Sequence, residues 1–157
     1  MKAIIRTLAV IAALAATSAW AAGGKDPAPA TPEDPVIEKS KAAIAGQNWA
    51  QAQDILREGL AKNPADADYH NLFAYSIRMG ANPQMDLVFR HYNEALRIDP
   101  DHRGAHEYLG EAYLMTGNLP KAKDHLKVLD RLCVFPCREY TMLKKAVADY
   151  EAKQAQK

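Results

Sequence analysis

The segment 106–130 restricts the fold more than any other part of the chain, because it is patterned as two amphipathic helices joined by a tight turn. In each half, apolar residues recur at the three- and four-residue spacing of one helix face. Thr116, Gly117 and Asn118 separate the halves with residues that end one helix and cap the next. Gly110 lies inside the first helix, where glycine is unfavourable unless another helix backbone comes very close. The segment therefore predicts a helical hairpin that packs against a neighbour.

Prolines mark a repetition of this hairpin along the chain. Pro64 and Pro100 are 36 residues apart, and Pro136 follows after another 36. Each of the first two ends a helical pattern, and the helical patterns before them predict helices at 36–45, 48–61, 67–79 and 85–98. We therefore predict an all-α fold, an α-solenoid of about three helix-turn-helix repeats at residues 35–65, 66–102 and 103–136.

The third predicted repeat carries a Leu-Gly pair, a tyrosine, a turn glycine and an alanine at fixed spacing: Leu109, Gly110, Tyr113, Gly117 and Ala122. This pattern resembles the tetratricopeptide repeat (TPR), a helix-turn-helix unit of about 34 residues that stacks into solenoids. The first two repeats share its periodicity. At the place of Gly110, we expect Ser40 in the first repeat and Phe73 in the second.

Residues 137–157 follow the repeats and predict a final helix at 137–153 with a frayed tail. Tyr140, Leu143, Val147 and Tyr150 fall on one face of this helix. It matches the first helix of a further repeat that has no partner, and charged residues cover its outer surface. We expect it to act as the capping helix of the solenoid.

The N-terminus has the pattern of a cleaved signal peptide at residues 1–21. Lys2 and Arg6 precede the apolar run 8–16, and small residues on either side of Trp20 form a cleavage pattern that ends at Ala21. The alternative, a transmembrane anchor, needs a longer apolar stretch of about 20 residues. We therefore predict export to the periplasm of a Gram-negative bacterium, with cleavage near Ala21. Residues 22–34 are rich in proline and glycine and predict a disordered linker.

Charge and motifs argue against several classes of function. The chain has 20 Lys and Arg against 19 Asp and Glu, and loss of Lys2 and Arg6 with the leader makes the balance slightly acidic. Such a balance does not suit nucleic-acid binding. The sequence contains no nucleophile motif, phosphate-binding glycine loop or dinucleotide fingerprint. We predict that the protein is not an enzyme and needs no cofactor.

Cys133 and Cys137 are the two cysteines of the chain, and Pro136 lies between them. Export places them in an oxidising compartment, and a short turn can bring them within disulfide distance, so we predict a structural disulfide between them. The alternative is a metal- or redox-handling accessory protein that uses these cysteines and nearby histidines. His102 and His106 have the spacing at which two histidines can share a metal, but no zinc-protease motif surrounds them, and we predict no metal site.

The TPR resemblance implies that the first helix of each repeat lines a concave groove that binds a segment of another protein. The main candidates for this groove are His70, Asn71, Arg78, Glu107, Tyr108, Glu111 and Lys145. The matching positions also include Ile37, Lys41, Ala74, Met115 and Thr141. Both signs of charge and an aromatic ring suit peptide recognition by hydrogen bonds and a few anchors.

The sequence thus favours a non-enzymatic, periplasmic module for protein–protein interaction, an adaptor or assembly factor. Its partner is another protein or peptide segment rather than nucleic acid, and contact with the membrane is expected only through the cleaved leader. A third possibility is a structural subunit, a homo-oligomer that associates through the exposed ends of its solenoid.

Overall fold

The computed structural model describes residues 34–135 and 137–156. All the described residues belong to one compact unit. The predicted signal peptide lies outside the described residues, as does the predicted linker except for Asp34. The described part forms the helices α1 (Pro35–Ala45), α2 (Trp49–Lys62), α3 (Ala67–Met79), α4 (Met85–Ile98), α5 (Arg103–Met115), α6 (Leu119–Leu132) and α7 (Arg138–Ala155).

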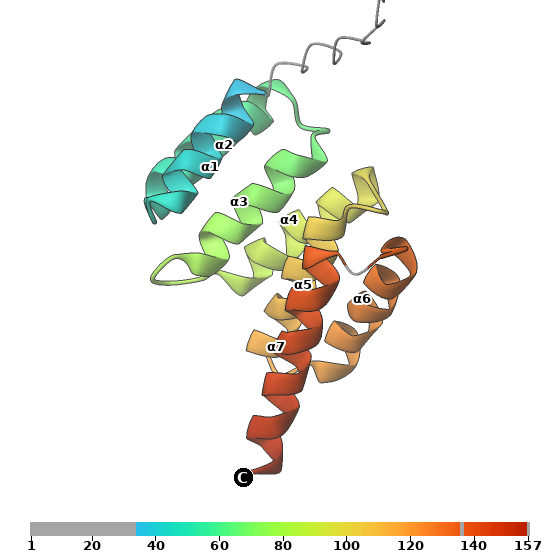
Figure 1. The fold of residues 1–157 in the computed structure, drawn as a ribbon. Helices are drawn as coiled ribbons and strands as arrows, with labels where there is room; N and C mark the ends of the chain where they lie inside the picture. The colour runs from blue at the N-terminus through green and yellow to red at the C-terminus, as the bar shows by residue number, and fades with distance from the viewer. Residues whose placement is uncertain (1–33, 136, 157) are drawn as a thin grey trace, which may run out of the picture. The chain divides into compact units, whose positions relative to one another are not determined.

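Consecutive helices pair as hairpins, which we call the first (α1–α2), second (α3–α4) and third (α5–α6) hairpin (Figure 1). The first helix of each hairpin also packs against the first helix of the next hairpin, α1 with α3 and α3 with α5, and α5 packs against α7 in the same way. The predicted all-α solenoid with a final single helix is therefore confirmed. Within the described ranges there is no β-strand, and no helix there is both long and apolar enough to cross a lipid bilayer.

Local sequence explains where several helices begin. Asp34 caps α1, because its Oδ1 accepts a hydrogen bond of 2.7 Å from the backbone N–H of Val36, and a proline follows it at the first helical position. Asp66 caps α3 in the same manner. In the third hairpin, Gly117 adopts a φ of +80°, which glycine tolerates best, and Asn118 caps α6. The turn that the sequence predicted between α5 and α6 is thus present.

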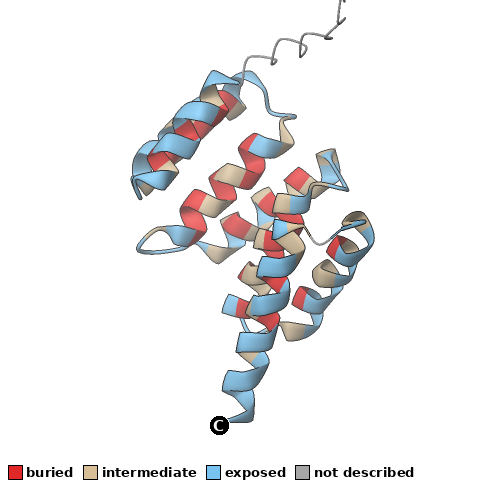
Figure 2. Ribbon diagram, viewed as in Figure 1, coloured by how far each residue is buried: buried red, intermediate tan, exposed pale blue. Residues whose placement is uncertain are grey.

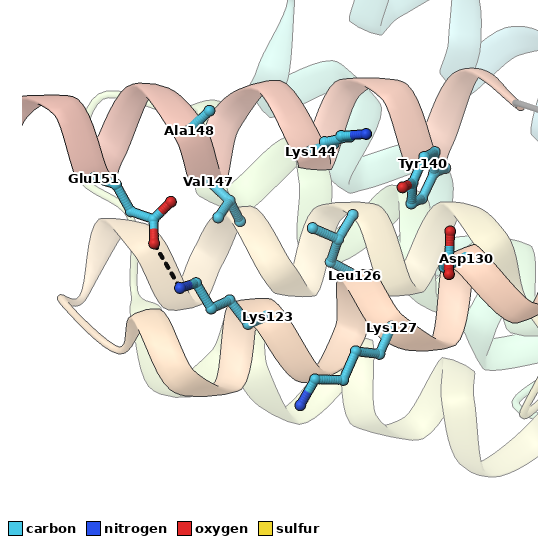
Figure 3. A pocket seen from close by; sticks show the side chains of 9 residues that line it. All are labelled: Lys123, Leu126, Lys127, Asp130, Tyr140, Lys144, Val147, Ala148 and Glu151. Carbon is cyan, nitrogen blue, oxygen red and sulfur yellow. Dashed lines mark ion pairs between the residues drawn. The ribbon is translucent and has the colours of Figure 1, made fainter.

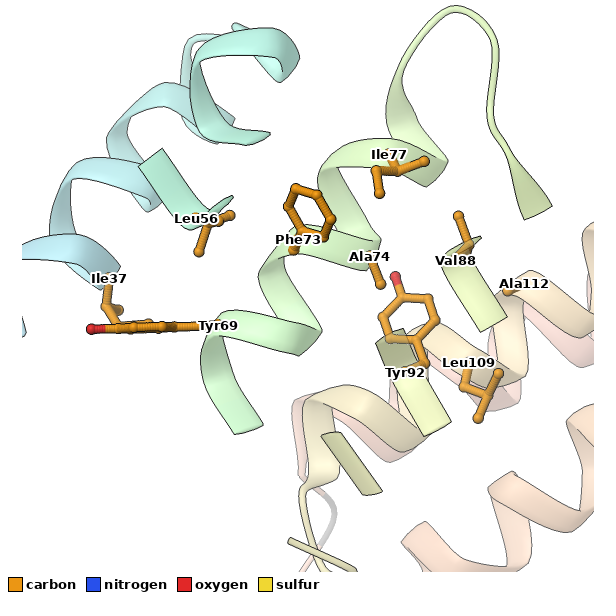
Figure 4. Packing of buried hydrophobic residues seen from close by; sticks show 10 residues of the cluster. All are labelled: Ile37, Leu56, Tyr69, Phe73, Ala74, Ile77, Val88, Tyr92, Leu109 and Ala112. Atoms are coloured by element: carbon orange, nitrogen blue, oxygen red, sulfur yellow. The ribbon is translucent and has the colours of Figure 1, made fainter. Parts of the chain in front are cut away.

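The core runs as a continuous cluster through α1 to α5, and a second, smaller cluster of α5, α6 and α7 meets it at Tyr113 (Figure 2). Tyr92 and Leu109 lie in the first cluster, with no exposed surface (Figure 4). The second cluster contains Leu129, Leu143 and Val147, and it holds α7 against α5 and α6. The last helix is therefore an integral part of the folded unit.

Gly110 shows why the third hairpin needs a glycine inside a helix. A Cβ atom at this position would lie 2.6 Å from Cδ2 of Leu143 in α7. The close neighbour of Gly110 is thus a side chain of α7, and not a helix backbone as the sequence suggested. The equivalent residue 36 positions earlier is the buried Ala74, so our alignment of Gly110 with Phe73 was wrong by one residue. The position 34 residues later is the exposed Lys144.

The connection from α6 to α7 is closed by a disulfide. The sulfur atoms of Cys133 and Cys137 lie 2.00 Å apart and their Cα atoms 5.7 Å apart, as the sequence predicted for a bonded pair. Val134 and Phe135 lie within this short loop and are 89% and 82% exposed. The disulfide joins the end of the third hairpin to the start of α7.

Candidate partner-binding surface

The seven main candidates for the groove lie on three neighbouring helices, α3, α5 and α7, whose common side we call the inner face, and the further candidates Ile37 and Lys41 lie on α1. The structure divides them by exposure. Buried are His70, Asn71, Arg78 and Glu107. Tyr108 and Glu111 are half-buried, and Lys145 is exposed and pairs with Asp149 at 2.5 Å. Several of the predicted contact residues therefore serve the protein's own packing.

Arg78 is the centre of the inner face. Its Nη2 donates a hydrogen bond of 2.8 Å to Oε2 of Glu111, which links α3 to α5. Its guanidinium group also lies 5.4 Å from the ring centre of Tyr75 and 5.6 Å from that of Tyr108. Its Nε lies 3.4 Å from the hydroxyl of the buried Tyr92. A cation that contacts two rings and a carboxylate is fixed in place, so Arg78 forms a rigid floor for this face.

Two buried acceptors on the inner face have no hydrogen-bond donor within the described protein, Oδ1 of Asn71 and Oε2 of Glu107. They lie 36 residues apart, at equivalent positions of α3 and α5. A buried acceptor without a donor costs about 1–3 kcal/mol, so each such atom needs an explanation, and binding of a ligand is one. Both residues were predicted in the groove, but no local pattern in the sequence indicated that they would be buried.

Glu107 is held in an unusual protonation state by its surroundings. Burial raises the pKa of its carboxyl group from the ordinary 4.5 to about 7, and the attraction of Arg138 opposes this rise only in part. The nearest guanidinium nitrogen of Arg138 is 3.8 Å away, and its side chain is 67% exposed. Near neutral pH, Glu107 can therefore carry either a proton, as a donor, or a negative charge, as an acceptor for a cation.

A hollow of about 360 Å³ opens on the inner face, and we call it the inner hollow. It is lined by Arg78, Glu111, Leu114, Met115, Ala146, Asp149, Tyr150 and Lys153. Met115 is 54% exposed at its edge, and most of the exposed lining is apolar. The hollow brings together Arg78 and Glu111, two of the predicted groove residues, with residues of α7 that the sequence analysis did not select.

His70 has a different role from the one predicted. Its Nδ1 lies 2.8 Å from Nδ1 of His91 on α4, and its Nε2 lies 3.0 Å from the carbonyl oxygen of Pro64. His70 therefore links α3 to α4 inside the second hairpin. This pair was not predicted from the sequence.

The same arrangement occurs again in the third hairpin. Nδ1 of His106 lies 2.8 Å from Nδ1 of His125, and its Nε2 lies 2.9 Å from the carbonyl oxygen of Pro100. His70 and His106, which we call the inner histidines, are 36 residues apart, as are Pro64 and Pro100. This spacing is the signal in the sequence that could have revealed both pairs. We call these two contacts the histidine pairs.

The chemistry of the pairs assigns their protons. A carbonyl oxygen only accepts, so Nε2 of the inner histidine is the donor in that contact. When both rings are neutral, Nδ1 of the inner histidine is then free to accept from its partner His91 or His125, which we call the outer histidine. Burial and the neighbouring histidine lower the pKa of His91 and of His125 to about 4. Burial also lowers the pKa of His106. His91 and His125 are thus neutral at neutral pH and can each donate a hydrogen bond to their partner ring.

The structure offers no ligand set for the metal alternative. Among residues 34–135 and 137–156, no three His, Cys, Asp or Glu side chains converge as metal ligands do. His102, one member of the four-residue spacing, instead caps α5 by accepting from the N–H of Ala105 at 3.1 Å. Its Nε2 lies 3.2 Å from Asp68. Its partner in that spacing, His106, belongs to a histidine pair.

Comparison with known proteins identifies the fold. No protein-family model matches the sequence, and a search of curated protein sequences finds no match. Solved structures do match. The TPR domain of Sgt2 from Aspergillus fumigatus has a TM-score of 0.67 at 20% identity, covering 80% of this chain and 82% of that one. The Yersinia enterocolitica type III secretion chaperone SycD, in complex with a peptide of the translocator YopD, has a TM-score of 0.62 at 16% identity, with 77% and 91% covered.

A third similar structure is PcrH in complex with the chaperone binding region of PopD, with a TM-score of 0.62 at 16% identity, covering 77% of this chain and 90% of that one. All three are similar to this chain over most of their length. The fold is therefore of the TPR type, as the sequence resemblance predicted. At these identities the similarity shows the fold alone.

Proposed function

We propose that this chain is a non-enzymatic interaction module that binds a peptide or protein segment on its inner face, as an adaptor or assembly factor in the periplasm. The observation that carries the proposal is the inner hollow. It combines an apolar lining with charges of both signs and is built by the three helices α3, α5 and α7. Such a surface provides an apolar anchor and a polar rim, the two parts of a peptide-binding site.

The rigidity of Arg78 supports this assignment. Because its guanidinium group is already held by Glu111 and two tyrosine rings, a bound segment finds a preformed surface and loses less free energy to ordering. The complexes of SycD with a YopD peptide and of PcrH with a region of PopD are consistent with a segment bound to this fold. They do not identify the partner of this chain.

The unpaired acceptors of Asn71 and Glu107 indicate what the bound segment offers. Both lie on the inner face and lack donors within the described protein. Backbone N–H groups of an extended segment, or a basic side chain, would supply those donors. Arg138 covers Glu107 loosely and is exposed enough to move aside.

A peptide-display experiment tests the proposal without knowledge of the partner. Random 12-residue peptides are selected on the full chain, and the enriched peptides are measured against Met115→Glu and Met142→Glu. Both methionines are exposed, 54% and 42%, but only Met115 lines the inner hollow. The same substitution at Met142 therefore controls for added charge and for general damage to the surface.

We expect the selected peptides to bind the wild type and Met142→Glu equally, and Met115→Glu at least about tenfold more weakly, as for loss of one central contact. Equal binding to all three forms would overturn the assignment of the inner face. Arg78→Glu is unsuitable as a test, because a buried cation that packs between helices would be replaced by an anion. Its loss of binding would not be separable from loss of the fold.

The periplasmic location belongs to the same proposal and is supported by the leader pattern of residues 1–21. Expression of the full chain in a Gram-negative host, followed by fractionation and mass spectrometry, tests it. We expect the periplasmic form to begin at Ala22. An uncleaved chain in the cytoplasmic fraction would contradict the proposed location and leave the binding surface unaffected.

A further inference from the structure

A second hollow, which we call the outer hollow, lies open between α6 and α7 (Figure 3). Its volume is about 440 Å³, and it is lined by Lys123, Leu126, Lys127, Asp130, Tyr140, Lys144, Val147, Ala148 and Glu151. Leu126 and Val147 form an apolar floor, and the ion pair between Lys123 and Glu151 closes one end at 2.5 Å. This surface has no part in the inner face.

The repeat spacing identifies what belongs in the outer hollow. Tyr140 and Val147 of α7 lie 34 residues after His106 and Tyr113 of α5. In the third hairpin, those two residues contact the partner helix α6 through one side chain, His125: His106 at 2.8 Å between the Nδ1 atoms, and Tyr113 by ring stacking at 5.6 Å. The matching side chains of α7 line the open hollow instead. The hollow is therefore the place where a helix packed on α7 would lie.

We propose that α7 of a second copy of this chain fills this place, so that two copies pack antiparallel about a twofold axis. The α7 residues that line the hollow form a single helical stripe: Tyr140, Lys144, Val147, Ala148 and Glu151. An axis between Val147 and Ala148 sets Lys144 of each copy opposite Glu151 of the other. The pairing occurs twice by symmetry, as in any isologous dimer.

Charge favours a second copy over a partner of another kind. The rim carries three lysines, Lys123, Lys127 and Lys144, against Asp130 and Glu151, so it is neither strongly basic nor strongly acidic. A surface with both signs in a reciprocal order is complementary to itself. The small side chain of Ala148, exposed next to the axis, allows the two helices to approach closely.

The test measures the oligomeric state of the full chain by sedimentation equilibrium over a range of concentrations, with circular dichroism to verify that each variant is folded. Ala148→Arg places a long, charged side chain at the axis. Lys144→Glu and Glu151→Lys each create two like-charged contacts in their own dimers. Lys145→Glu is the matched control, because the same charge change is made one residue along, outside the outer hollow.

We expect a wild-type dimer, a monomeric Ala148→Arg, and about tenfold weaker association of Lys144→Glu and of Glu151→Lys, with Lys145→Glu unchanged. An equal mixture of Lys144→Glu and Glu151→Lys should form mixed dimers, since both contacts then join opposite charges. A folded wild type that stays monomeric at the highest concentration would overturn the proposal. A dimer that persists in Ala148→Arg, or single variants that do not recover on mixing, would overturn it as well.

Discussion

The second and third hairpins differ from α7 in whether a partner helix covers the first helix of the repeat. In the hairpins, α3 and α5 each pack on a partner helix of their own, and a histidine pair joins the two at the same place. In α7 the equivalent position is Tyr140, which faces the outer hollow. Within the described residues, the surface of α7 that corresponds to the covered surface of α5 therefore stays open.

The difference shows that two kinds of contact hold a repeat in this fold. Contacts within the second and third hairpins include a polar element, a histidine pair whose inner ring also contacts the carbonyl group of Pro64 or Pro100. Contacts from one unit to the next include close apolar packing, as for Leu143 against Gly110. Helix α7 keeps the second kind and lacks the first. It should therefore respond to apolar truncation and be insensitive to the titration of histidine.

The largest expected effect comes from Leu143→Ala, which removes the contact that holds α7. Leu143 has no exposed surface, so we expect the free energy of unfolding to fall by about 2–4 kcal/mol. Hydrogen exchange should show loss of protection in α7 before loss in α3 and α4. Leu129→Ala serves as the comparison, because that residue is equally buried in α6. Equal loss of protection across all helices would mean that α7 is not a separable unit.

Glu107→Gln tests the junction between α5 and α7 through pH. The pKa of Glu107 is raised from 4.5 to about 7, so the folded state binds this proton more tightly than the unfolded state does. Stability is therefore highest below pH 4.5 and declines as the pH rises to about 7. We expect the variant to be more stable than the wild type by about 2–3 kcal/mol at pH 8 and equally stable at pH 4.5, by urea denaturation. A constant difference across this range would contradict the raised pKa.

The histidine pairs should make the hairpins, and not α7, sensitive to acid. The pKa values of His91 and His125 are lowered from 6.5 to about 4, so their contribution to stability is complete above pH 6.5 and is lost as the pH falls towards 4. Groups near these rings include Arg90 and Glu94 in one hairpin, and Lys121 and Asp124 in the other.

The double variant His91→Gln/His125→Gln keeps a donor for each inner histidine and removes the titration. Between pH 8 and pH 5, we expect the free energy of unfolding of the wild type to fall by about 2 kcal/mol more than that of the double variant. This figure is reduced because the histidine rings are partly exposed. The two single variants should each show about half of this, because their sites lie in separate hairpins. An identical acid profile for wild type and double variant would refute the role of the pairs.

The smallest effect is expected for the disulfide. Replacement of Cys133 and Cys137 by serine opens a loop with a sequence separation of only 4, which restricts the unfolded chain little. We expect a loss of about 1 kcal/mol, below the usual 2–4 kcal/mol, with α7 still in place through Leu143 and Val147. Thermal unfolding with and without reductant measures it. A loss as large as that of Leu143→Ala would show that the covalent link, rather than packing, holds α7.

Much of the fold could be predicted because it depends on local patterns. Apolar spacing, Asn118 as a cap, and the prolines at 36-residue intervals predicted most helix ends to within one or two residues, although α5 begins at Arg103, three residues before the predicted segment 106–130. The disulfide followed from the short separation of the cysteines. The alignment of Gly110 with Phe73 failed because it relied on a Leu-Gly pair, whereas the true constraint is a small buried residue, and Ala74 satisfies it.

The candidate site was harder to predict, because burial depends on contacts between helices that are distant in sequence. Arg78 and Glu111 were both selected as exposed contact residues, and nothing local indicates that they pair with each other. His70 was selected by its position on a first helix, but its ring turns towards His91 and away from that role. The 36-residue spacing of His70 and His106 was visible in the sequence, but only the structure shows that each of them contacts a second histidine.

Lys144 has a consequence for how such an array could be lengthened. It occupies the place of Gly110, where even a Cβ atom would meet the side chain of the following unit. A copied hairpin fused after α7 would therefore meet a long charged side chain at its tightest contact. An engineered extension of the array should therefore begin with Lys144→Gly or Lys144→Ala.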